Sequence, residues 1–225
     1  KSVGGTLRPE DRGVPGRNGQ LPNPGLDPES GIGADAGLQF ICPKGYLATV
    51  RGFVNVVDDA IVETVVSETP SQSQSVNAGR TTAWGLEVDV RRPLTEWLGW
   101  FANYTYTQTD IDNDRDPDQD GADVPFVPAH MGNVGLTLSL PADVTVATYL
   151  HLAGSIYDST SRSNRRKFDS YEVVNVDVRK GLYRSGNRSV DLYVELYNVT
   201  NNEFEMPWQF QDPGFSAMVG IQATF

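Results

Sequence analysis

The sequence has little cysteine, little histidine and few cationic side chains. Its single cysteine, Cys42, excludes an internal disulfide and is expected to be a small buried residue. His130 and His151 have no partner at metal-ligand spacing, so structural roles are predicted for both. With 18 lysines and arginines against 29 aspartates and glutamates, the formal net charge is −11. Nucleic acid is therefore not expected as a partner, because phosphate binding needs clustered cations.

Long apolar runs are also absent. No stretch of about 18 apolar residues occurs, so no helix is expected to span a membrane. A membrane β-barrel is not excluded, because each of its strands needs only about ten residues of alternating polarity. No nucleophile motif, phosphate-binding loop or paired acid and base is found, so an enzyme is not predicted.

What the sequence does contain is clearest in its last twelve residues, Gly214 to Phe225, which read GFSAMVGIQATF. Every second residue is apolar, and the residues between them are mostly small or polar, which predicts a strand with two unlike faces. The strand ends on an aromatic residue, Phe225. This pattern is typical of the last strand of an outer-membrane β-barrel, although a strand of a soluble sandwich shows the same alternation.

The rest of the chain alternates between strand patterns and turn patterns, which predicts an all-β antiparallel fold. About nine strands are expected, at 34–42, 46–66, 80–92, 96–109, 130–140, 143–156, 168–181, 188–199 and 214–225. Their connections alternate between short ones (43–45, 92–95, 141–143, 182–188) and long ones (67–79, 110–129, 157–167, 200–213). A membrane barrel sorts its loops in this way, with short turns at the periplasmic end and long loops outside, whereas a sandwich has no reason to do so.

Four segments resemble the family of TonB-dependent outer-membrane receptors. They are the N-P-G-L-D-P-E-S segment at 23–30, the strand at 53–62, the W-G-L-E-V-D and Y-T-Y-T hairpin at 84–107, and the end of the chain from Val194 through N-V-T-N-N to Phe225. The segments occur in the family's order and at its spacing. The resemblance covers the chain from about residue 21 onward.

The resemblance implies a transmembrane β-barrel of about 22 strands around a plug domain. This chain would supply about nine of those strands and no plug, with 1–33 an extracellular loop and 34–225 the C-terminal part of the barrel. The implied role is uptake of a scarce nutrient of the ferric siderophore, haem or cobalamin type across the bacterial outer membrane. The implied partners are the plug, TonB acting through the plug, the remaining strands, outer-membrane lipid and lipopolysaccharide, and a small-molecule ligand.

Strand parity supports the same conclusion without the resemblance. If the last of nine strands runs toward the periplasm, the first does too, and two parallel strands do not close an ordinary antiparallel barrel. We therefore expect other strands to complete it, from a second chain or from an upstream segment. Two alternatives stay open: a small complete outer-membrane barrel with a structural or adhesive role, and a soluble secreted ligand-binding β-sandwich.

Two loops carry candidate ligand-binding residues. Arg162, Arg165 and Arg166 lie in the loop at 157–167 and could attract an anionic ferric chelate or lipopolysaccharide phosphates, although ordinary loop charge is an equal interpretation. Trp208 and Phe210, in the last long loop, could stack on a ligand or simply pack within the loop.

The loop that begins at residue 110 reads DIDNDRDPDQDG and contains a candidate calcium site. Asp116, Asp118 and Asp120, followed by Gly121, match the start of a calcium loop, but Val127 stands where the closing glutamate of an EF-hand would be. A solvated acidic loop is the alternative. On the strands, a further set of acids is predicted to line the lumen: Glu87, Asp89, Asp177, Asp191 and Glu195.

Overall fold

The structure is a computed structural model that describes residues 19–225, apart from 44, 69, 78 and 208–211. Within those ranges every regular element is a β-strand. In the described part of the chain, no helix is long and apolar enough to cross a membrane.

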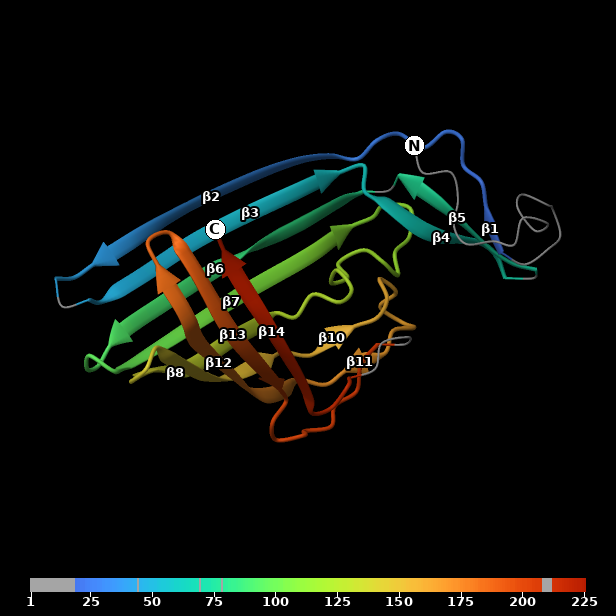
Figure 1. Cartoon of the computed structure of the whole chain (residues 1–225). Helices are drawn as coiled ribbons and strands as arrows, with labels where there is room; N and C mark the ends of the chain where they lie inside the picture. Colours follow the sequence, from blue (N-terminus) through green and yellow to red (C-terminus); the bar gives the residue numbers. More distant parts are fainter. Residues whose placement is uncertain (1–18, 44, 69, 78, 208–211) are drawn as a thin grey trace.

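Nine antiparallel strands form one large sheet, in the order β14-β13-β12-β9-β8-β7-β6-β3-β2. Neighbours along the chain are neighbours in the sheet, and the strands curve together into an arc (Figure 1). Their bounds are β2 Ser30–Ile41, β3 Leu47–Asp58, β6 Arg80–Pro93, β7 Leu98–Asp112, β8 His130–Leu140, β9 Val144–Ala153, β12 Tyr171–Ser185, β13 Arg188–Tyr197 and β14 Ser216–Thr224. The prediction of nine antiparallel strands is confirmed.

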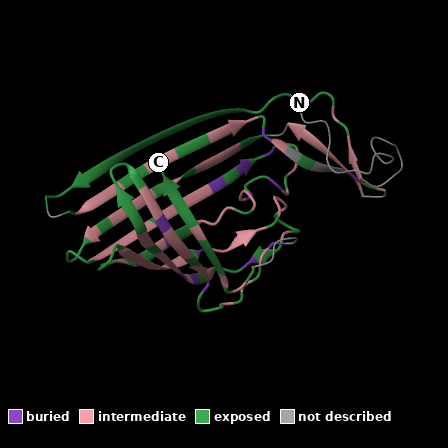
Figure 2. Ribbon diagram, in the orientation of Figure 1, coloured by how far each residue is buried: buried purple, intermediate pink, exposed green. Residues whose placement is uncertain are grey.

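The alternating sequence gives this sheet one apolar and one polar face. On β6, Trp84, Leu86 and Val88 point to one side, and Gly85, Glu87 and Asp89 to the other. The apolar residues are not covered: Leu86 is 41 % exposed, and Leu136 on β8 is 43 % exposed. Buried residues are few along the strands in Figure 2. Among the described residues, therefore, no second sheet is stacked on the apolar face of the large sheet, which contradicts the sandwich alternative.

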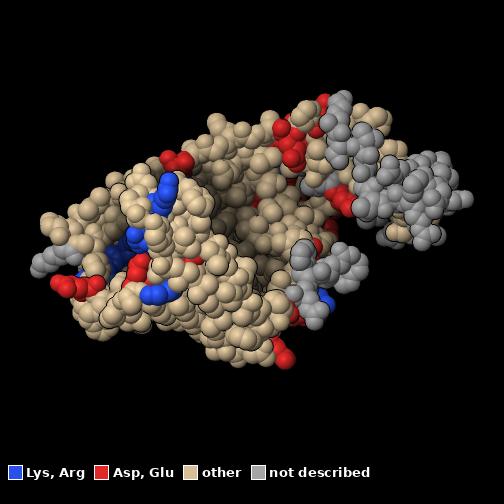
Figure 3. All heavy atoms as spheres, viewed as in Figure 1, with Lys and Arg blue, Asp and Glu red and all other residues tan. Residues whose placement is uncertain are grey.

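On the face that Figure 3 shows, most charged side chains lie toward the ends of the molecule. In Figure 3, lysines and arginines cluster around the β12–β13 hairpin, and acidic groups lie at both ends of the arc, with a broad uncharged surface between them. A band without charges between charged ends is the surface expected of a wall that stands in lipid.

Aromatic rings on the polar face lie against glycines of the next strand. A Cβ atom built on Gly85 would be 2.7 Å from the Phe53 ring, one on Gly135 would be 2.8 Å from the Phe101 ring, and one on Gly220 would be 2.3 Å from the Tyr193 ring. The pairs are in direct cross-strand register. Each ring therefore takes the space that a neighbouring side chain would have filled.

The connections alternate in length, as predicted. Short turns join β2 to β3, β6 to β7, β8 to β9 and β12 to β13, whereas two of the long connections, from β3 to β6 and from β9 to β12, carry extra strands. β4 (Ile61–Glu68) and β5 (Ser71–Asn77) form a hairpin, and β1 (Gly19–Leu21) pairs in parallel with β5. β10 (Ile156–Tyr157) and β11 (Lys167–Phe168) form a two-stranded sheet in another long loop.

Two predicted boundaries are wrong. The strand expected at 46–66 is two strands, because Asp59, with a φ of 56°, turns the chain after Asp58 and sends β4 into the small sheet. The segment expected to be loop up to residue 33 already contains β1, and β2 begins at Ser30. Residues 1–18 lie outside the described part of the chain.

Candidate functional site

The long loops at one end of the sheet contact one another through Asp118. Its carboxylate accepts a hydrogen bond from the Ser161 hydroxyl at 2.5 Å and one from the backbone N–H of Ser163 at 2.9 Å. These bonds hold the pKa of the Asp118 carboxyl below its usual value, because they stabilise the charged form. The guanidinium of Arg162 donates to the carbonyl of Asp120 at 3.0 Å. The loops at 113–129 and 154–170 are thereby joined.

The other two predicted ligand-binding arginines also join loops. Arg165 forms an ion pair with Asp123 at 3.1 Å and lies 3.6 Å from the centre of the Tyr157 ring. Arg166 forms an ion pair with Glu205 in the last long loop and lies over the ring of Phe168. Trp208 and Phe210 lie outside the described residues. The structure thus gives these arginines internal contacts, and their binding of a ligand stays a prediction.

The three aspartates of the predicted calcium site have separate roles. Asp116 accepts a hydrogen bond from the N–H of Asp118 at 3.0 Å, and Asp120 accepts one from the N–H of Asn113 at 3.2 Å. Asp118 binds the neighbouring loop. Among the residues that the structure describes, no group of three or more His, Cys, Asp or Glu side chains is placed to hold a metal ion. Calcium binding stays a prediction that this geometry does not support.

The polar face carries separate sets of charged and amide groups that contact one another within each set. Arg51 pairs with Glu87 at 2.6 Å and approaches Asp35 at 3.8 Å. Further along the sheet, Asn133 donates to Asn103 at 2.9 Å and hydrogen-bonds the Nδ1 atom of His151 at 2.9 Å. The five acids predicted to line the lumen lie on β6, β12 and β13, and the alternation along these strands directs their side chains to this face. Asp191, whose side chain is 6 % exposed, pairs with Arg184 at 2.5 Å.

A stacked pair of rings that sequence analysis did not single out ties the last long loop to this face. Tyr171 and Phe204 lie parallel, with ring centres 4.0 Å apart, and the ring of His151 is 6.0 Å from that of Tyr171. The alternation on β12 places Tyr171 on the same face as Asn175 and Asp177, so its direction could have been read from the sequence. The contact between Tyr171 and Phe204 could not have been predicted in this way.

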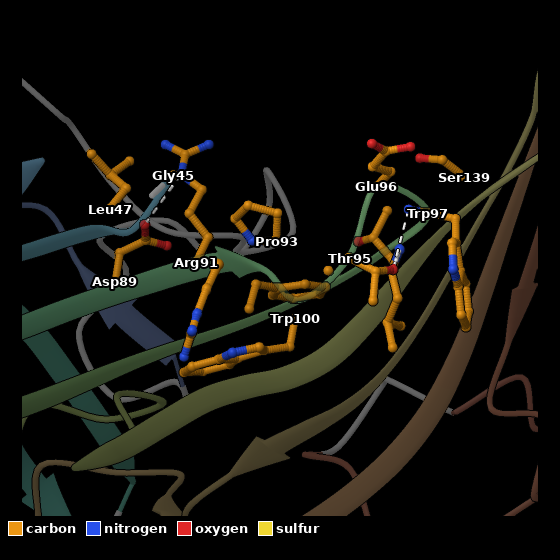
Figure 4. A pocket seen from close by; sticks show the side chains of 15 residues that line it. Gly45, Leu47, Asp89, Arg91, Pro93, Thr95, Glu96, Trp97, Trp100 and Ser139 are labelled. Carbon is orange, nitrogen blue, oxygen red and sulfur yellow. Dashed lines mark hydrogen bonds and ion pairs between the residues drawn. The ribbon is translucent and has the colours of Figure 1, made fainter. Parts of the chain in front are cut away.

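A hollow of about 550 Å³ opens at the short-turn end of the sheet. Figure 4 shows Arg91 and Asp89, 3.9 Å apart, on one side of it and Trp97 on the other. The turn between β6 and β7 is fixed by Thr95, whose hydroxyl accepts hydrogen bonds from the N–H groups of Trp97 and Leu98 at 3.3 and 3.0 Å. The hollow therefore places a charged pair beside an exposed indole.

Residues 3–199 match the family model described as TonB dependent receptor-like, beta-barrel. The chain belongs to the TonB-dependent receptor family. No curated protein matches it. The family is one of outer-membrane receptors and transporters of Gram-negative bacteria, not of enzymes.

Solved structures share this fold at low sequence identity. A mutant of the ferric enterobactin receptor PfeA from Pseudomonas aeruginosa has a TM-score of 0.69 and 17% identity, over 92% of this chain and 32% of its own. The copper transporter OprC has a TM-score of 0.68 and 18% identity, over 92% and 33%. The ferric citrate transporter FecA has a TM-score of 0.63 and 15% identity, over 91% and 31%. The chain therefore spans about a third of the length of each.

Proposed function

We propose that this chain forms part of the wall of a TonB-dependent transporter that imports a scarce nutrient across the bacterial outer membrane. The observation that carries the proposal is the division of one curved sheet into an uncovered apolar face and a hydrogen-bonded polar face. Such a sheet is stable only with lipid on one side and an aqueous or protein-filled lumen on the other.

Other strands complete the barrel in this proposal. β2 and β14 are the two edges of the large sheet, and within the described residues neither pairs with the other. An edge strand in lipid would leave backbone groups without hydrogen bonds, at a cost of several kcal/mol each. The polar face would then surround a plug domain, and TonB would act through that plug.

The cargo class proposed is a metal chelate or cofactor of the ferric siderophore, haem or cobalamin type. The similar solved structures are named for ferric enterobactin, ferric citrate and copper, and those names describe those proteins. The proposed contact surface is the cluster of long loops, with Arg162, Arg165, Arg166, Trp208 and Phe210. Arg166 supports this role, because its side chain keeps 61% of its surface exposed despite the pair with Glu205.

Uptake by intact cells tests the function. A strain without the gene and the same strain with the gene restored would be given radiolabelled iron as a panel of chelates, haem and labelled cobalamin. We expect the restored strain to regain uptake of one cargo and to lose it again when the proton-motive force is collapsed. Recovery of the protein as a water-soluble monomer without detergent would contradict the proposal.

A further inference from the structure

Phe126 differs from the other described residues in combining a large apolar side chain with a left-handed backbone. Its φ is 62°, and the other non-glycine residues with a positive φ are aspartates, asparagines and one alanine. A bulky residue is disfavoured in this conformation, because its Cβ atom lies too close to the following carbonyl oxygen. Pro125 and Phe126 form the middle of a turn, and a positive φ directly after proline in a turn favours glycine. The turn by itself therefore does not call for a phenylalanine.

Packing of the phenyl ring does not compensate for the strained backbone. Phe126 is 53 % exposed, so more than half of its surface is left uncovered by the rest of the chain. A buried aromatic side chain stabilises a fold by removing apolar surface from water, whereas an exposed one contributes little. The stability of this chain therefore does not explain the phenylalanine either.

Three contacts fix the segment that carries the ring. They are the ion pair between Asp123 and Arg165 at 3.1 Å, the hydrogen bond from the N–H of Val124 to the Thr109 hydroxyl at 2.9 Å, and the hydrogen bond from the N–H of Phe126 to the Tyr157 carbonyl at 2.9 Å. Pro125 and Pro128 further restrict the backbone on both sides of the ring. A segment that is already ordered loses little conformational entropy when it binds a ligand.

The same contacts place this segment at the lumen side of the long-loop end. Thr109 lies on β7, and the alternation along that strand puts it on the same face as Asn103, which is hydrogen-bonded within the lumen wall. Ile111 has the same parity, bridges to Ala122 and is 2 % exposed. The connection from β7 to β8 therefore folds back over the lumen face of β7, and a cargo that enters from outside would pass beside it.

We propose that Phe126 is a specificity-determining contact for the cargo and that it selects molecules that present an aromatic face. Strained backbone conformations cluster at ligand-binding sites, where the surrounding structure holds them in place. A phenyl ring has no hydrogen-bonding group, so it discriminates by flat apolar surface, and two aromatic rings in contact gain more than their buried area alone provides. A wholly polar chelate gains nothing from it. The inference rests on the proposed uptake function and narrows its cargo.

The test measures binding by the full-length receptor, purified in detergent. The aromatic probes are hemin and the ferric complex of catechol, and ferric citrate is the probe without a ring. Phe126→Gly removes the ring and suits the positive φ, whereas Phe126→Tyr keeps both the ring and the strain. The matched control is Phe215→Ala, because Phe215 is 52 % exposed but alternates onto the outward face with Ala217 just before β14.

We expect the wild type to bind at least one aromatic probe, and Phe126→Gly to bind that probe at least about tenfold more weakly. Phe126→Tyr and Phe215→Ala should bind it as the wild type does. The urea midpoint of Phe126→Gly should be no lower than that of the wild type, because glycine adopts the positive φ without strain. A ring that only supports the fold would give the opposite result, a lower midpoint with unchanged binding.

Unchanged binding by Phe126→Gly, an equal loss of ferric citrate binding, or a lowered urea midpoint would overturn the proposed contact. Cells that take up ferric citrate through a receptor that binds neither aromatic probe would leave the transport function standing and overturn this inference alone. The absence of energy-dependent uptake of every cargo would overturn both.

Discussion

At the scale of single residues, Asn198 in the N-V-T-N-N segment fixes the point where a strand ends. Asn198 is fully buried and has a φ of 50°, a conformation that asparagine tolerates better than most residues. Its N–H donates to the Asn175 side chain at 3.0 Å, and its own amide exchanges two hydrogen bonds with the backbone of Asn202, each at 2.9 Å. It thus ends β13 and starts the last long loop.

Replacing this residue should destabilise the protein. We expect Asn198→Ala to lower the free energy of unfolding by about 2–4 kcal/mol, because it removes both side-chain hydrogen bonds to the half-buried backbone of Asn202 and forces alanine into a left-handed conformation. The urea midpoint of the folded protein in micelles measures this change. The control is Thr200→Ala, which removes only a 3.4 Å contact with Asn198. Equal midpoints for both variants would contradict the assigned role.

Asp118 gives the joined loops a pH dependence. Its pKa is lower in the folded protein than the ordinary value of 3.8, so the contact contributes fully above that value and is lost as the pH falls through the lower folded pKa. Hydrogen exchange of residues 159–164 should show protection near neutral pH that disappears in this acid range. Asp118→Asn should remove the protection at neutral pH, while the neighbouring Asp114→Asn should not. Equal hydrogen-exchange protection of residues 159–164 with and without the Asp118 carboxylate would contradict its role in joining the loops.

At the scale of elements, the pairing of rings with glycines shapes the lumen wall. A ring that lies over a glycine of the next strand covers backbone without filling the lumen. Phe53 on β3, Phe101 on β7 and Tyr193 on β13 repeat this arrangement around the sheet. The sequence shows the glycines and the aromatic residues, but only the register shows that they are opposite each other.

This arrangement predicts that Gly85 cannot be enlarged. In Gly85→Ala the new Cβ atom would lie 2.0 Å from the carbonyl oxygen of Tyr106 and 2.7 Å from the Phe53 ring. We expect a loss of about 1–3 kcal/mol in unfolding free energy, because the backbone or the ring must move. The control is Gly52→Ala on the neighbouring strand, where the nearest atom would be 3.9 Å away. A midpoint for Gly85→Ala equal to that of the control would contradict the close contact.

At the scale of the whole molecule, the two faces of the sheet should meet different solvents. In a Cys42→Ser background, Asn133→Cys and Thr137→Cys should each react with a water-soluble maleimide in intact outer membranes, because side chains at these two positions face the lumen. In the same background, Val134→Cys and Leu136→Cys should be protected from the maleimide by lipid, and should react once the protein is unfolded in urea. Equal labelling of both sets would mean that the sheet does not stand in a bilayer.

The sequence by itself determined the strands, their two faces and the alternation of short and long connections. Each of these depends on local rules: a side-chain period of two and the residues that favour turns. The rules failed at Asp59, where one residue ended β3 and moved the next strand into another sheet.

Only the tertiary structure decided how the candidate site is arranged. Asp118 and Ser161 are 43 residues apart in the chain, and their contact depends on the register and curvature of the strands between them. The same holds for the ion pair between Arg166 and Glu205. The residue types predicted charged and aromatic loops. They did not predict which groups contact one another, because these contacts depend on distances between segments far apart in the sequence.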